Sequence, residues 1–172
     1  SNLVTLKQRK QACIDKIIKL TGPASSFWKS VFPKETQEIV YKSEPDCGYV
    51  LMYDLFLRFR RNIPSTYSLK KRLVEQYTPL LSKHGVKILD ILAKQNQKHD
   101  AIQQVMNNQV SLETLIMSDQ YYLTDLDVWV LCDFYKLPVL LVSDTNLESL
   151  GLNVPWLVLG GNKNADVYYC VR

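Results

Sequence analysis

Apolar residues in the first sixty positions are spaced in a way that predicts two helices of different character. Residues 6–20 place their apolar side chains near a 3.6-residue period and are followed by Gly22-Pro23, so we predict one amphipathic helix there. Residues 47–59 are apolar on nearly every side, which is typical of a helix buried in a core. Between them, residues 39–41 predict a short strand.

The middle of the chain is predicted to be helical. Residues 69–80 repeat apolar side chains on one helix face, and Ser65 and Ser68 before them are good N-caps. Because proline cannot donate to the helical ladder, we expect this helix to end near Pro79. Further helices are expected at 86–95 and 100–107, followed by a shorter turn at 111–117.

The last third combines one helix with short strands. Thr124 and Asp127 fit a capping box, which predicts a helix that begins there and ends before Leu137-Pro138. The fold class expected is therefore α+β, with several helices packed on a small, mostly antiparallel sheet built mainly from the C-terminal third. Strands are predicted at 139–142, 156–159 and 167–171, the last two as a hairpin across the turn residues 160–164.

Length and composition fit one globular domain. The 172 residues are 47% hydrophobic and 22% charged, so the chain can bury a core without cross-links and is neither disordered nor low in complexity. No apolar run reaches the roughly 18 residues of a membrane span. The chain starts Ser1-Asn2 without Met, which we expect of a fragment of a longer protein. Within the single domain, residues 1–40 are expected to be a helical extension and residues 41–172 the core.

The charge is unevenly distributed. The net charge is +4, but residues 1–100 hold 18 basic against 9 acidic side chains, and the remainder hold 3 against 8. No acid lies between Asp54 and Glu75, so this stretch either forms a solvated helix face or binds a phosphate backbone or an acidic protein surface. Its basic residues are Arg58, Arg60, Arg61, Lys70, Lys71 and Arg72.

The cysteines and histidines do not predict a metal site. Cys13, Cys47, Cys132 and Cys170 have neither close spacing nor neighbouring histidines, so we expect no zinc site, no disulfide and a reducing, cytoplasmic compartment. His84 and His99 lie far from any cysteine or acidic pair. We expect no metal and no cofactor.

Cys47 is the strongest candidate for a catalytic residue. It stands at the predicted N-terminus of the buried helix, where the helix dipole and the free first-turn amides lower a thiol pKa and stabilise an oxyanion. The alternative is a small buried apolar side chain, which is the usual role of a free cysteine.

The surroundings of Cys47 resemble the ovarian-tumour (OTU) family of cysteine peptidases, which are mostly deubiquitinases. Glu44-Pro45-Asp46-Cys47-Gly48-Tyr49 stands where that family has Asp-Gly-x-Cys before a buried helix. A second family block, Trp-x-x-x-Glu-Leu-x-Ala-Leu before an apolar strand, resembles residues 121–131 followed by 137–142, with Asp127 at the Glu position. The second block is also similar to OTU-like domains of large DNA viruses. The resemblance spans residues 40–172 and implies a papain-related fold.

The chain departs from the family pattern at the catalytic positions. The family places its general-base histidine on the last strand, but here Tyr168 or Val167 occupies that place, and a phenol with a pKa near 10 is a poor base at neutral pH. Asp166 is the acid nearest this strand and has no imidazole to orient. Before the cysteine, Glu44 replaces Asp and Pro45 replaces Gly, which removes a backbone donor.

We therefore interpret the chain as an OTU-like domain that has lost peptidase activity and works as an interaction or structural module, as part of a larger viral protein. The implied partner is a protein, with ubiquitin or a ubiquitin-like protein as the family candidate, and the implied location is the cytoplasm, a virion or a viral factory. The first alternative is an active deubiquitinase with Cys47 as nucleophile and a base from His84, His99 or a segment outside this fragment. The lesser alternative is nucleic-acid binding through residues 58–72.

Overall fold

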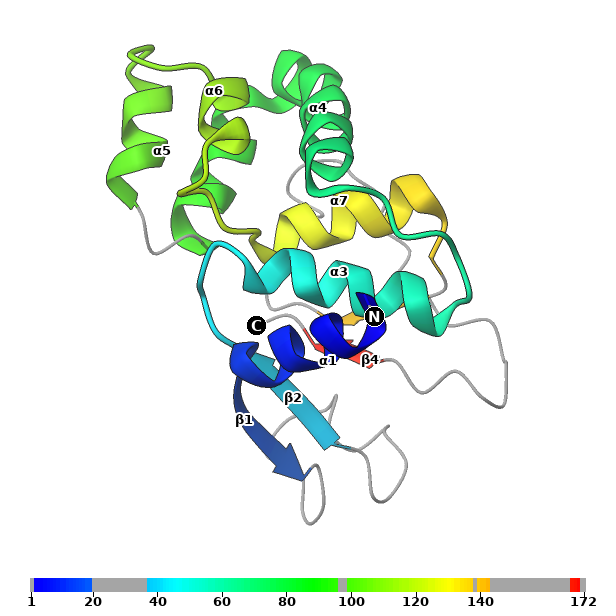
Figure 1. Cartoon of the computed structure of the whole chain (residues 1–172). Helices are drawn as coiled ribbons and strands as arrows, with labels where there is room; N and C mark the ends of the chain where they lie inside the picture. Colours follow the sequence, from blue (N-terminus) through cyan, green and yellow to red (C-terminus); the bar gives the residue numbers. More distant parts are fainter. Residues whose placement is uncertain (1, 20–36, 96–98, 138, 143–167, 171–172) are drawn as a thin grey trace.

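A computed structural model describes residues 2–19, 37–95, 99–137, 139–142 and 168–170, and helices predominate among them (Figure 1). Within these residues, no helix is both long enough and apolar enough to cross a membrane. The elements in chain order are α1 (Asn2–Cys13), β1 (Ile14–Lys19), β2 (Gln37–Tyr41), α3 (Cys47–Arg58), α4 (Thr66–Gln95), α5 (His99–Met106), α6 (Leu112–Met117), α7 (Asp125–Tyr135), β3 (Leu140–Val142) and β4 (Tyr168–Cys170).

The N-terminal segment is half helix and half strand. The prediction of one helix over 6–20 is wrong, because α1 ends at Cys13 and β1 continues from Ile14. β1 pairs antiparallel with β2 from Ile14 opposite Tyr41 to Lys19 opposite Gln37, which confirms the strand expected at 39–41. The isoleucines of β1 are β-branched, so pairing with β2 overrides their helical spacing. The pairing also joins the expected helical extension to the expected core.

The buried helix predicted at 47–59 is confirmed. α3 carries eight buried residues and lies at the centre of the molecule in Figure 1, with α1 on one side and α7 on the other. Three of them, Val50, Met52 and Leu55, have no exposed surface at all. Burial of this apolar surface is the main force that holds α4 and α7 around α3.

α4 consists of the two predicted helices, joined at a bend at His84, where the backbone leaves helical values (φ −136°, ψ 23°). The first helix continues through Pro79, so its predicted end near Pro79 is wrong, and the second runs to Gln95. Buried Leu73 and Ile88 pack into the same core on both sides of the bend. The short helices α5 and α6 follow and contact α4. α5 agrees with the helix expected at 100–107, whereas α6 is a helix where only a short turn was expected.

The strands form two separate pairs. β3 pairs with β4 in a parallel arrangement, with Leu140 opposite Tyr168. The prediction of a mostly antiparallel sheet built mainly from the C-terminal third is therefore not confirmed, since the longer antiparallel pair, β1–β2, is N-terminal. A tight hairpin turn joins antiparallel strands, whereas parallel strands such as β3 and β4 need a longer connection between them. The strand expected at 156–159 and its hairpin lie outside the described residues.

Candidate functional site

Cys47 lies where the sequence predicts, as the first residue of α3. The chain turns into the helix through hydrogen bonds from the Cys47 N–H to the Glu44 carbonyl (3.1 Å) and from the Val50 N–H to the Asp46 carbonyl (3.0 Å). Asp46 is the N-cap residue, but its side chain does not cap the helix. The Cys47 side chain is almost fully buried, with 1% of its surface exposed.

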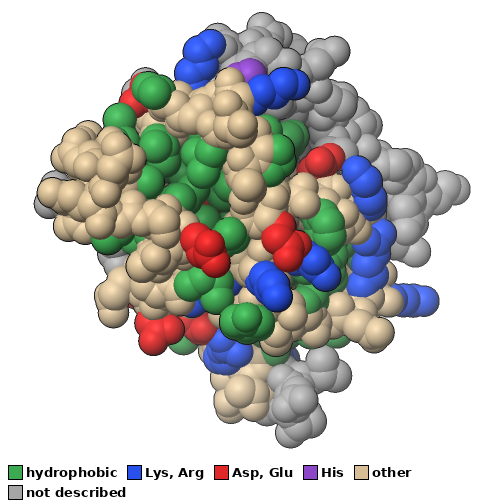
Figure 2. Space-filling model, turned by 90° about the horizontal axis from the view of Figure 1, so that it is seen from above, with side chains coloured by type: hydrophobic (Ala, Val, Ile, Leu, Met, Phe, Trp, Pro, Cys, Tyr) green, Lys and Arg blue, Asp and Glu red, His purple; other side chains and the backbone are tan. Residues whose placement is uncertain are grey.

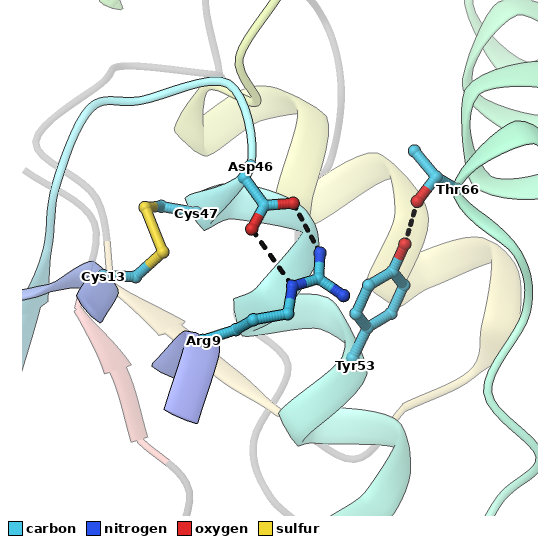
Figure 3. Close-up of polar contacts among 6 residues, drawn as sticks. All are labelled: Arg9, Cys13, Asp46, Cys47, Tyr53 and Thr66. Carbon is cyan, nitrogen blue, oxygen red and sulfur yellow. Dashed lines mark hydrogen bonds and ion pairs between the residues drawn. A yellow bond between two sulfur atoms is a disulfide. The ribbon is translucent and has the colours of Figure 1, made fainter. Parts of the chain in front are cut away.

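The sulfur of Cys47 is bonded to the sulfur of Cys13, at the end of α1 (Figure 3). The two Cα atoms are 5.3 Å apart, a separation typical of disulfides. The expectation of no disulfide is therefore wrong, because packing of α1 on α3 joins two cysteines that are 34 positions apart. The pair also removes the main reason for expecting a reducing compartment, since disulfides persist in oxidising surroundings.

A charged pair lies beside the disulfide and joins the same two elements. Both Asp46 carboxylate oxygens accept hydrogen bonds from Arg9 of α1, one of them from Nε at 3.2 Å (Figure 3). The bond to Asp46 raises the pKa of Arg9 above its ordinary value, against a smaller opposing effect of burial. The Arg9 guanidinium also lies 5.6 Å from the centre of the Tyr53 ring. The Asp46 side chain is therefore occupied by Arg9 and does not cap α3.

The closing strand expected from the sequence is confirmed as β4, which begins at Tyr168. β4 contacts β2, and β2 contacts α3, so the end of the chain lies on the same side of α3 as α1 (Figure 1). The side chain of Tyr168 and all of Asp166 lie outside the described part of the chain. Their expected roles at the site stay predictions.

The two histidines are separated from the start of α3 in sequence and in element. His84 is half-buried at the bend of α4, and His99 begins α5. Among the described hydrogen bonds and ion pairs, none joins His84 to Cys47 or Asp46. A disulfide sulfur has no proton to give to a base and is no nucleophile, so this arrangement does not perform peptidase chemistry while the bond is closed.

The second motif forms a buried polar cluster around Asp127. The predicted capping box is confirmed: the Thr124 N–H donates to Asp127 Oδ2 (2.7 Å) and the Asp127 N–H donates to Thr124 Oγ1 (3.3 Å). Tyr77 of α4 and Tyr121 add hydrogen bonds of 2.5 and 2.6 Å to the same carboxylate. Burial raises the pKa of Asp127, while these hydrogen bonds act in the opposite direction. The cluster fixes α7 against α4 and is closed to solvent.

Most of the basic residues singled out from the sequence are used inside the molecule. Lys70 is buried and donates to the carbonyls of Met117 (3.4 Å) and Ser118 (3.1 Å), beyond the reach of any phosphate chain. The others separate into residues with intramolecular partners and residues exposed to solvent. Arg58 binds Asp54, Arg61 binds the Tyr135 and Lys136 carbonyls, Arg72 binds Glu75, and Arg60 and Lys71 are exposed.

Three residues of the two clusters were missed by the sequence analysis. Cys13 and Arg9 were assigned only to a helix, and Tyr77 only to an apolar helix face. No local pattern identifies a disulfide partner or an ion pair across 34 or more positions. The one available signal for Tyr77 was that an acid at a buried capping box requires hydrogen-bond donors.

The described residues do not contain a group of three or more His, Cys, Asp or Glu side chains that could hold a metal ion. Comparisons with protein-family models, with curated proteins and with solved structures find no match.

Proposed function

We propose that the chain is an OTU-like domain without peptidase activity that works as a protein-interaction module. The observation that carries this proposal is the bond between Cys47 and Cys13, which occupies the sulfur that a peptidase would use as nucleophile. The sequence supports it independently, because the closing strand has no histidine to act as base.

The geometry around Cys47 supports a structural role for this cysteine. Its sulfur is buried, α1 lies over the start of α3, and Arg9 occupies the carboxylate of Asp46 next to it. Pro45 has no amide to offer an oxyanion. The sulfur and the neighbouring carboxylate are thus used in contacts that stabilise the fold, and the chain before Cys47 lacks a backbone donor that acyl transfer would use.

The test is a reaction with ubiquitin that carries a thiol-reactive group at its C-terminus. The key variant is Cys13→Ala, because it releases the Cys47 sulfur without added reductant. We expect no covalent adduct by mass spectrometry with the parent chain, with the reduced parent or with Cys13→Ala. A known OTU peptidase in parallel reactions verifies the probe.

An adduct on Cys13→Ala that disappears in the double variant Cys13→Ala/Cys47→Ala would overturn the proposal. It would show that Cys47 becomes a ubiquitin-directed nucleophile once it is free, with a base supplied by another residue. Cys132→Ala is the matched control for adducts on the other buried thiol, and it should behave as the parent does.

A further inference from the structure

We propose that the surface at the α3–α4 connection binds an acidic protein segment that carries apolar side chains, an inference that rests on the proposed interaction function. We call this surface the basic corner. It comprises Arg60, Ile63, Tyr67, Lys71, Arg72 and Phe134.

The basic corner exposes apolar side chains that the core does not use. Tyr67 is 61% exposed, Ile63 is 42% exposed and Phe134 is 37% exposed. They come from three elements: the start of α4, the connection before it and the end of α7. The hydrogen bonds from Arg61 to the end of α7 join the connection to that helix, and exposed apolar side chains at such a junction are typical of protein-binding sites.

Contacts within the molecule hold these three elements in place relative to one another. Arg61, in the connection, donates to the carbonyls of Tyr135 and Lys136 at the end of α7. The Arg72 guanidinium of α4 lies 5.5 Å from the centre of the Phe134 ring. A pre-ordered surface loses little conformational entropy when a partner binds.

The basic corner carries a positive charge. Of its three basic side chains, Arg60 and Lys71 are exposed and Arg72 is paired with Glu75, and no acid lies between residues 55 and 74. Two acids lie at its edge, and each has a basic neighbour: Glu75 binds Arg72 (2.8 Å), and Asp133 lies 3.7 Å from Lys136. In Figure 2, Lys and Arg side chains line the right edge of the face, next to hydrophobic side chains, on the side where Figure 1 shows the α3–α4 connection. Charge complementarity therefore indicates an acidic partner.

The combination favours a protein over a nucleic acid. A phosphate chain needs a continuous row of free cations, whereas here Arg58, Arg61 and Arg72 already have partners within the chain. Tyr67 and Phe134 can contact either a base or an apolar side chain, whereas Ile63 cannot stack on a base and is a good contact for a leucine or phenylalanine. An acidic segment with apolar side chains uses both properties of the surface.

Fluorescence anisotropy of a labelled peptide tests the proposal on the full chain. The probe is a peptide that alternates Glu with Leu and Phe, compared with one in which Gln replaces Glu and one in which Ser replaces the apolar residues. We expect the first peptide to bind with an affinity that falls as salt increases, and the other two to bind at least about tenfold more weakly.

Variants locate the binding site. Arg60→Glu/Lys71→Glu and Ile63→Ser/Tyr67→Ser should each weaken binding about tenfold or more, because they remove the charge and the apolar contacts separately. Lys83→Glu and Val86→Ser, also exposed on α4, are the matched controls and should keep the parent affinity. Circular dichroism and cooperative unfolding verify that each variant folds.

Equal binding by parent and variants, or no binding of the acidic peptide, overturns the proposal for this surface. Tighter binding of a single-stranded oligonucleotide that the same variants abolish would assign the surface to nucleic acid instead. Neither result involves the ubiquitin probe, so the failure of this proposal would not bear on the proposed absence of peptidase activity.

Discussion

Cys13, the last residue of α1, is covalently joined to Cys47, the first residue of α3. α1 is a largely polar helix, and its Leu6 side chain packs against the hydrophobic core. Its attachment therefore depends largely on the disulfide and on the ion pairs of Arg9 with Asp46 and of Lys10 with Asp54. The bond that closes the candidate nucleophile thus also helps to hold the N-terminal helix in place.

Loss of the disulfide should lower the free energy of unfolding. The two cysteines are 34 positions apart, and a chain-entropy model for a loop of this length gives about 4 kcal/mol at 25 °C. Disulfides typically contribute about 2–4 kcal/mol, so we expect a loss in that range. Urea unfolding of the parent with and without reductant measures the difference. Cys13→Ser/Cys47→Ser should match the reduced parent and ignore reductant. A parent whose stability does not respond to reductant contradicts the pairing.

The ion pair should contribute far less than the disulfide. The side chains of Arg9 and Asp46 are 40% and 57% exposed, so solvent screens their attraction. Asp46→Asn should therefore change the free energy of unfolding by less than about 1 kcal/mol. A loss comparable with that of the disulfide variant would show that this pair, and not the covalent bond, anchors α1.

Gly48 and Gly85 should respond to alanine in opposite directions. A Cβ on Gly48 would lie 2.7 Å from the Leu123 Cβ, an atom near the backbone that cannot move away easily. Gly48→Ala should therefore cost about 1–3 kcal/mol of stability. A Cβ on Gly85 meets nothing within 4 Å, so Gly85→Ala should add about 0.5–1 kcal/mol by helix propensity. Chemical denaturation of both variants measures the two changes in the free energy of unfolding. Equal changes would contradict the close contact between position 48 and Leu123.

The sequence predicts those features that depend on local patterns. The burial of α3 and the capping box at Thr124 were predictable because periodicity and spacing determine them within a few residues. The disulfide and the antiparallel pairing of β1 were not, because both depend on contacts with residues 18 or more positions away. The helical spacing of residues 6–20 was misleading since tertiary pairing outweighs weak local propensity.

Cys132 should be inert in the folded protein. Burial raises the pKa of its thiol to about 12, and its side chain has no exposed surface. Because the thiolate is the reactive form, alkylation by iodoacetamide at pH 8 should proceed only as fast as the chain opens. Denaturant should restore the rate of an ordinary thiol. Mass spectrometry of the peptide that contains Cys132 measures both rates, and rapid alkylation without denaturant would contradict its burial.

Asp127 should make stability depend on pH in a defined direction. Its pKa is raised by burial in the folded protein, whereas in the unfolded chain it is about 3.9. As the pH rises above about 4, the unfolded chain loses this proton first, so the free energy of unfolding falls until the pH passes the raised folded pKa.

Asp127→Asn cannot ionise, and its free energy of unfolding minus that of the parent should therefore rise with pH across this interval. Asp133→Asn, which replaces an acid on the same helix that is 49% exposed, is the matched control variant. Tyr77→Phe removes a hydrogen bond that favours the ionised carboxylate, so it should extend the falling region of the parent profile to higher pH. Urea unfolding of the four proteins from pH 4 to 7 tests this, and parallel profiles for parent and Asp127→Asn would show that this carboxylate titrates alike in both states.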